Sequence, residues 1–205
     1  MPLAEALAAE PMALPAQTAL KLTAPEREFS ETMDVNQGKL SMGFTTPVTN
    51  QHPGFAAMQV FNALYGAGMT SKLFLNVREK LSLCYYAGSG YYGSKGIVTV
   101  SSGIDEANYE TAKAEILRQL QLTADGEITE AELTAAKAAI ISGLRSVPDA
   151  PGALENFYGT AYIAGMRYDL PGYIEAIRAV TAADVARCAA GVKLHTVFFL
   201  KGEAK

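Results

Sequence analysis

The sequence predicts an α+β fold in which helices cover one face of a sheet that contains antiparallel strands. Segments with strand-like alternation and segments with helical spacing are largely segregated along the chain. The 205 residues are 49% hydrophobic and 19% charged, a composition that can bury a sizeable core. We expect a folded domain over residues 34–205, preceded by an extended linker or arm over residues 1–33, where prolines and charges interrupt any pattern.

The domain is expected to open with a strand and two helices. Residues 35–46 alternate loosely between apolar and polar side chains, which is typical of a strand with one buried face. Apolar side chains then recur at helical spacing over residues 55–65, and Gly66 suits the end of that helix. Ser71 can cap a second, short helix.

Further along the chain, the spacing of apolar side chains first becomes typical of strands and then again typical of helices. Residues 83–92 and 96–103 are predicted to pair as a hairpin, since a Gly-rich turn joins them. Thr129 and Glu132 form a capping box at the start of a helix that runs to residue 146. Helices are also expected over residues 106–122, 153–166, 170–180 and 182–188, and a final buried strand over residues 193–201.

Charge and cysteine usage narrow the function classes. The net charge is −4 and no basic block is present, which argues against nucleic acid and against membrane surfaces as partners. No apolar stretch approaches the roughly 18 residues of a membrane-spanning helix. Cys84 and Cys188 are far apart, which favours a reduced, cytoplasmic setting over a disulfide framework.

The chain offers little for metal or thiol chemistry. His52 and His195 are its two histidines, and neither has a second histidine or a glutamate three or four residues away. We therefore predict no metal site in this chain. Cys84 is expected to pack as a small hydrophobe, and an enzyme that uses Cys84 as a nucleophile is the least favoured hypothesis because neither histidine has an evident route to it.

One stretch, residues 66–92, places Arg78 near the end of a short helix and Tyr85 in the next strand. A guanidinium and a phenol close together can stabilise a developing oxyanion, by charge and by a hydrogen bond respectively. From spacing alone a structural role is the stronger interpretation. Arg78 would pair with Glu79 or another carboxylate, and Tyr85 would lie in the core.

This stretch resembles the second-half domain of the pitrilysin family of zinc metallopeptidases, which includes mitochondrial processing peptidase and insulysin. The family pattern runs from a Gly-rich turn through Ser-Arg-Leu-Phe, Val-Arg-Glu-Lys and Leu-Gly-Leu to a tyrosine. This chain departs from it at Lys72 and Ser82. The corresponding residues are Gly66-Ala67-Gly68, Ser71-Lys72-Leu73-Phe74, Val77-Arg78-Glu79-Lys80, Leu81-Ser82-Leu83 and Tyr85.

The resemblance implies a half-domain without metal that works beside a zinc-bearing half. In the family the first half carries H-x-x-E-H, and the second half supplies an Arg and a Tyr that reach the peptide carbonyl. Carried over, these roles fall on Arg78 and Tyr85, with Tyr86 as the substrate-binding alternative. This chain lacks the zinc motif, so it is predicted to be inactive alone, with zinc only in a partner half.

Two forms of this interpretation remain, and both involve a peptide or unfolded protein as substrate. The chain is either the C-terminal part of a longer peptidase or a member of a bacterial branch that has lost zinc and pairs with an active sister subunit. Residues 35–44 resemble that inactive branch. The alternative is a pure binding or assembly module, in which Tyr86, Tyr91 and Tyr92 form an interface.

Overall fold

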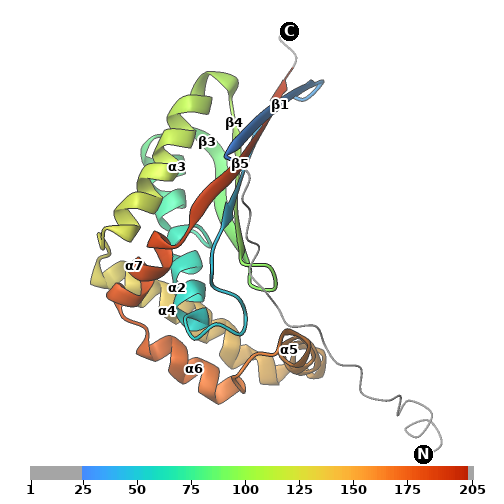
Figure 1. Cartoon of the computed structure of the whole chain (residues 1–205), viewed down its shortest axis with the longest axis vertical. Helices are drawn as coiled ribbons and strands as arrows, with labels where there is room; N and C mark the ends of the chain where they lie inside the picture. Colours follow the sequence, from blue (N-terminus) through green and yellow to red (C-terminus); the bar gives the residue numbers. More distant parts are fainter. Residues whose placement is uncertain (1–24, 203–205) are drawn as a thin grey trace, which may run out of the picture.

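The computed structural model describes residues 25–202 and contains a five-stranded sheet with helices on one face (Figure 1). The strand order is β1-β5-β2-β4-β3, in which β1 runs parallel to β5 and all other neighbours are antiparallel. The predicted α+β architecture is confirmed. The strands are β1 (Arg27–Met33), β2 (Gly38–Thr45), β3 (Cys84–Tyr92), β4 (Ile97–Ile104) and β5 (Lys193–Gly202).

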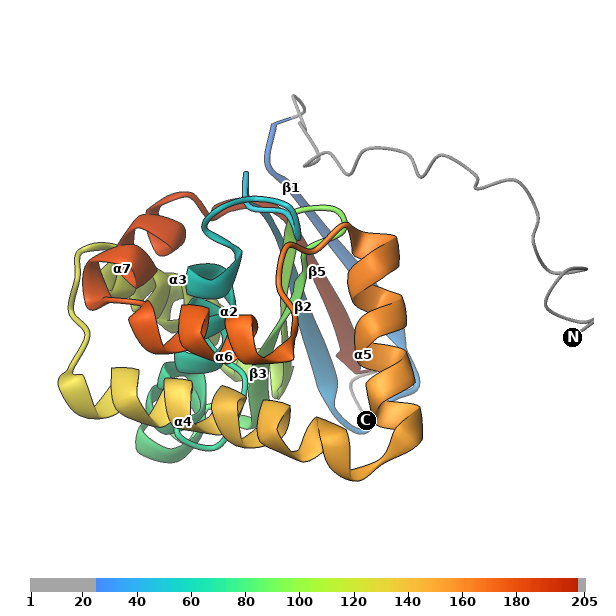
Figure 2. The same cartoon turned by 90° about the horizontal axis from the view of Figure 1, so that it is seen from below.

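The central strand β2 shows why one face of the sheet is covered. Leu40, Met42 and Phe44 are buried on the helix side, while Lys39 and Ser41, which alternate with them, are exposed. Successive side chains of a strand point to opposite faces, so an alternating sequence fits a sheet with one buried face. Figure 2 shows α5 (Pro151–Ala164) on the opposite side of the sheet from the other helices.

The helical layer is built around α2 (Phe55–Tyr65), most of whose side chains are buried. The Tyr65 hydroxyl donates to the Ile116 carbonyl at 3.0 Å, which ties α2 to α3 (Tyr109–Ala124). The other helices are α4 (Glu130–Ser146), α5 (Pro151–Ala164), α6 (Leu170–Ala179) and α7 (Ala182–Ala190). Figure 2 shows α5 lying apart from the cluster that the other helices form.

Helix starts follow local side-chain chemistry. The capping box predicted at Thr129 and Glu132 is present at the start of α4, with both reciprocal hydrogen bonds formed. A second box joins Thr181 and Asp184 at the start of α7. Two further elements, the helical turns η2 (Glu106–Asn108) and η3 (Val147–Asp149), precede α3 and α5.

The strand β1 falls within the stretch that the sequence assigned to an extended arm. It pairs in register with β5, from Arg27 opposite Thr196 to Met33 opposite Gly202. The sheet therefore includes residues 27–33, and assigning them to a linker was wrong. Residues 1–24 lie outside the described part of the chain, and the boundaries of the arm otherwise stay a prediction.

Candidate functional site

The segment that carries Arg78 and Tyr85 has an unusual backbone. Ser71 Oγ accepts a hydrogen bond from the Phe74 N–H at 3.3 Å, as predicted for a capping residue. The helix that follows, η1 (Leu73–Lys80), is a π-helix, a rare form that is frequently found at functional sites. After it, Ser82 adopts a positive φ of 50°, a conformation that non-glycine residues seldom adopt. The chain then enters β3.

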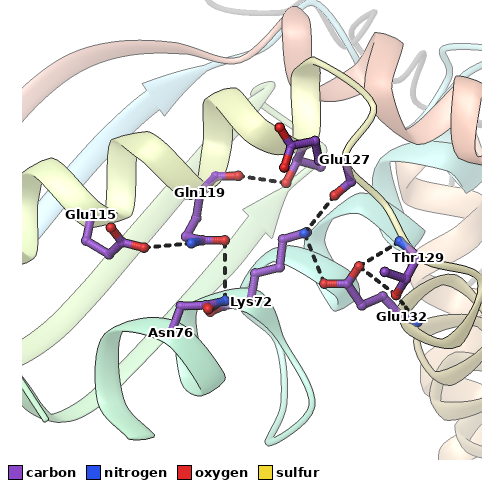
Figure 3. A network of polar contacts seen from close by, with 8 residues as sticks. Lys72, Asn76, Glu115, Gln119, Glu127, Thr129 and Glu132 are labelled. Atoms are coloured by element: carbon purple, nitrogen blue, oxygen red, sulfur yellow. Dashed lines mark hydrogen bonds and ion pairs between the residues drawn. The ribbon is translucent and has the colours of Figure 1, made fainter. Parts of the chain in front are cut away.

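A buried lysine anchors the start of this segment (Figure 3). The Lys72 ammonium lies 2.8 Å from the Glu127 carbonyl oxygen and 3.0 Å from Glu132 Oε1, and 8% of its side chain is exposed. Burial alone would raise the pKa of Glu132. The hydrogen bonds from Thr129 and Lys72 instead hold this pKa below the ordinary value, so the carboxylate stays charged opposite the ammonium.

A second set of contacts joins the middle of η1 to α3. The Asn76 amide donates to the Lys72 carbonyl at 2.9 Å and to Gln119 Oε1 at 3.4 Å. Gln119 is almost fully buried and donates in turn to Glu115 Oε1 at 2.6 Å. Lys72, Asn76, Glu115, Gln119 and Glu132 together are called the η1 polar network below (Figure 3).

Arg78 lies on the exposed side of η1. Its guanidinium carbon stands 4.7 Å from the centre of the Phe74 ring, and its Nη1 lies 3.4 Å from Glu79 Oε1. The ion pair predicted from spacing is therefore present. Both side chains are more than a third exposed, so this pair is a weak constraint. The Arg78 charge also acts on Cys84, which places it near the start of β3.

Tyr85 occupies a β-bulge. Cys84 lies opposite Ile104 and Tyr86 opposite Gly103, so two steps along β3 face one step along β4 and Tyr85 is the extra residue. Its side chain is 74% exposed. The interpretation of Tyr85 as a core residue was therefore wrong. No hydrogen bond joins Arg78 and Tyr85 among the described residues, and their catalytic roles stay a prediction.

Tyr86 is held more firmly than its neighbour. Its ring covers Gly103, where an added Cβ would stand 2.6 Å from the ring carbon Cε1. The Ser102 hydroxyl donates to the Tyr86 carbonyl at 2.8 Å. The Tyr86 side chain nevertheless remains 42% exposed, on the face of the sheet that points away from α2. A substrate-contacting role for Tyr86 stays a prediction.

The remaining candidates have structural surroundings. Burial raises the pKa of the Cys84 thiol, although a hydrogen bond with Ser102 and the Arg78 charge act in the opposite direction, and Cys84 packs against the core as a small hydrophobe. His52 Nδ1 accepts from the Gly54 N–H at 2.9 Å, and His195 Nδ1 lies 2.7 Å from Thr196 Oγ1. Over residues 25–202, no cluster of three or more His, Cys, Asp or Glu side chains could hold a metal ion. None of the described helices is both long and apolar enough to cross a membrane.

Sequence reasoning missed the η1 polar network. Lys72 stood out as a departure from the family pattern, and Glu132 as a capping residue, but nothing in the spacing joins them across the fold. The signal that was available is a lysine placed among apolar residues just before the short helix, where a buried cation requires a partner.

The fold and this segment match known proteins. Residues 8–140 match the family model described as Peptidase M16 inactive domain. The chain is 36% identical over 176 residues to a Bacillus subtilis (strain 168) protein described as "Probable inactive metalloprotease YmfF", over 86% of this chain and 41% of that protein. It is also 27% identical to a Rickettsia bellii protein described as an uncharacterized zinc protease, over 76% of this chain and 38% of that protein.

Solved structures give the same result. A conserved protein from Enterococcus faecalis V583 superposes with a TM-score of 0.86 at 31% identity, over 92% of this chain and 44% of that chain. The peptidase M16 inactive domain from Pseudomonas fluorescens superposes with a TM-score of 0.75 at 15% identity, over 93% of this chain and 47% of that chain.

The extent of these matches decides what they establish. The chain spans about two fifths of the length of the curated relatives and just under half of the two solved chains. The family model covers well over half of the 205 residues. The resemblance carried by residues 66–85 is confirmed, and the chain belongs to the family of peptidase M16 inactive domains.

Proposed function

We propose that this domain is the non-catalytic half of a two-part zinc peptidase, and that it lends Arg78 and Tyr85 to a zinc site on a partner half. The observation that carries the proposal is the bulge at Tyr85. It turns the phenol out of the sheet, 74% exposed, in the strand that follows the helix of Arg78. Bulges that re-aim a side chain are over-represented next to active sites.

The two side chains suit a carbonyl whose oxygen gains negative charge. The Arg78 guanidinium is permanently charged and would stabilise that oxygen electrostatically. The Tyr85 hydroxyl would donate a hydrogen bond to the same oxygen. Donors of this kind act most strongly where water is excluded, a condition that closure against a partner half would create. The zinc ion of the partner half would supply the Lewis acid and the water nucleophile.

The face of the sheet that points away from α2 would enclose the peptide. Buried residues of β4 alternate with Thr99 and Ser101 on that face, and Gly88 and Gly90 of β3 lie beside them. Small side chains leave room for an extended chain, and Tyr86 and Tyr92 stand exposed along the same strand. A peptide or unfolded segment is therefore the substrate class that we propose.

A second candidate is an inactive pseudo-peptidase that acts as a binding or assembly module. The observation that favours it is the engagement of Arg78 with Glu79 and Phe74, which gives the guanidinium partners within its own helix. In that case the exposed Tyr85, Tyr86 and Tyr92 would be contact residues of an interface, where tyrosine is enriched.

The experiment mixes this chain with a purified zinc-bearing half-domain and measures metal content and cleavage of an unfolded peptide. We expect no cleavage by this chain alone and cleavage by the mixture. Arg78→Ala and Tyr85→Phe are each expected to lower turnover about 100–1000-fold, the usual cost of losing one oxyanion donor. Tyr158→Phe, which changes an exposed tyrosine of α5 outside η1 and β3, is the matched control. Full turnover with both variants would show that the assigned roles are wrong. A zinc-bearing half whose cleavage is indifferent to this chain would favour the binding module.

A further inference from the structure

We propose that Lys72 is a positioning residue, which fixes the orientation of η1 and thereby sets Arg78 and Tyr85 for the carbonyl. The catalytic part of this inference rests on the proposed function. The mechanical part concerns this chain alone and is tested separately.

Lys72 joins three elements at one buried point. It lies directly before η1. Its ammonium donates to the Glu127 carbonyl, which belongs to the turn between α3 and α4, and pairs with the Glu132 carboxylate in the first turn of α4. Figure 3 shows the lysine side chain reaching from the η1 ribbon to both groups. A buried ammonium must keep such partners, because an unpaired charge is costly away from water. The start of η1 is therefore tied to the helical layer.

The other members of the η1 polar network continue this attachment along one side of the helix. Asn76 contacts Gln119 on α3. Residues 72 and 76 are four apart, and the i→i+5 hydrogen bonds of a π-helix bring residues four to five apart onto one face. The first turn of η1 is therefore held toward α3 and α4 on this face, whereas Lys80 at its end is exposed.

The consequence for Arg78 follows from the same geometry. With residues 72 and 76 held against α3 and α4, the side chains of Phe74 and Arg78 remain partly exposed. A rotation of η1 that released the network would move the guanidinium with it. The Leu83 N–H donates to the Val77 carbonyl at 3.2 Å, so a movement of η1 would also reach the residues that precede Tyr85.

The chemistry of position 72 gives a conservative variant. An arginine, the residue of the family pattern at this place, carries the donors to bridge a carboxylate and a carbonyl. A methionine has similar length and packs in apolar surroundings, yet it makes neither contact. Lys72→Arg should therefore keep the anchoring, and Lys72→Met should lose it while the core stays filled.

The mechanical part is tested by amide hydrogen exchange on this chain alone. Lys72→Met is expected to speed exchange in residues 73–83 about tenfold or more, with α2 and β4 unchanged, and Lys72→Arg is expected to restore protection. The matched control is Lys113→Met, which removes the ion pair between α3 and Glu28 at the far edge of the sheet. Unchanged exchange in Lys72→Met, or equal acceleration in the whole chain, would overturn the proposal.

The catalytic part is tested in the mixture with the zinc-bearing half. Lys72→Met is expected to lower kcat on the order of 100-fold, the usual effect of misplacing catalytic groups by about 1 Å, with KM nearly constant. Adding Arg78→Ala to Lys72→Met should cost little more, because the guanidinium is already displaced. Undiminished kcat in Lys72→Met would overturn positioning even if exchange is faster. A wild-type mixture that cleaves nothing would overturn the proposed function, while the exchange data would still decide the mechanical part.

Discussion

The two edges of the sheet are held in very different ways. At one edge, β3 is attached to the helical layer by several contacts. The Ser89 N–H donates to the Gly66 carbonyl at 3.0 Å, the Ser89 hydroxyl bonds to Asn62 Oδ1 at 2.8 Å, and the Tyr91 hydroxyl donates to the Val48 carbonyl at 3.0 Å. At the other edge, all seven residues of β1 are exposed.

This difference indicates that contacts at the β3 edge contribute more to the stability of the fold than contacts at the β1 edge. The side chain of Glu28, which accepts from Tyr109 and Lys113, provides the side-chain hydrogen bonds of β1 in the described structure. The residues proposed for catalysis lie on the other edge, where buried contacts from α2 and η1 fix the strand. Precise placement of functional groups requires such a supported backbone, and the following predictions test the contrast.

The largest effect is expected from Leu73→Ala, which empties a fully buried position on η1. Loss of a buried leucine typically costs about 2–5 kcal/mol, partly through the cavity that it leaves. Phe29→Ala on β1, where the ring is 49% exposed, should cost well under half as much. Chemical denaturation of both variants measures the difference. Equal losses would mean that the two edges contribute alike to stability.

A smaller effect is expected from Gly66→Ala. An added Cβ would stand 2.5 Å from Ser89 Oγ and 2.6 Å from Ser89 N, so α2 and β3 must move apart. Overpacking of this kind costs about 1–3 kcal/mol. The control is Gly143→Ala on α4, where an added Cβ meets nothing within 4 Å and a gain of about 0.5–1 kcal/mol is expected. Thermal unfolding compares the stability of the two variants. An unchanged stability of Gly66→Ala would show that the close approach of Gly66 to Ser89 does not stabilise the β3 edge.

Gly103→Ala should displace two side chains and little else. The added Cβ would stand 2.6 Å from the Tyr86 ring and 2.9 Å from Gln37 Oε1, and both side chains can move away, whereas no backbone atom is as close. We expect a stability change within about 1 kcal/mol and a clear shift of the Tyr86 ring resonances in NMR spectra. A loss comparable to that of Leu73→Ala would show that the Tyr86 ring is a structural part of the edge.

The smallest effect is a pH dependence confined to β1. Hydrogen bonds from Lys113 and Tyr109 lower the pKa of Glu28 below its ordinary value. A carboxylate with a lowered folded-state pKa stabilises the fold above its unfolded value, about 4.3, and this contribution is lost as the pH falls through the folded value. Amide exchange should therefore increase in β1 before it increases in β3 on acidification. Glu28→Gln should remove this difference, and simultaneous loosening of both edges in the wild type would contradict it.

The features that the sequence predicted correctly all depend on residues that lie close together along the chain. The alternation of Leu40, Met42 and Phe44 and the capping box at Thr129 and Glu132 depend on residues within a few positions of one another. The same applies to the pairing of Arg78 with Glu79. Local chemistry decides these features, so they can be read before the fold is known.

The features that sequence missed depend on partners far along the chain. The strand β1 exists because β5 offers it an edge, although its own residues show no buried face. The exposure of Tyr85 depends on its register against β4. The anchoring of Lys72 depends on Glu127 and Glu132, which belong to another part of the helical layer. Family resemblance singled out the two candidate residues, and only the assembled fold shows what holds them.

The single extra residue in β3 also shifts the alternation of side chains between the two faces of the sheet. In an uninterrupted strand Cys84 and Tyr86 would share a face, yet here Cys84 packs against the core opposite Ile104 and Tyr86 covers Gly103 on the other face. Deleting Tyr85 would make Cys84 and Tyr86 neighbours on opposite faces, as in a regular strand, and would remove only the exposed phenol. The bulge therefore adds one outward-facing side chain without changing which of its neighbours is buried.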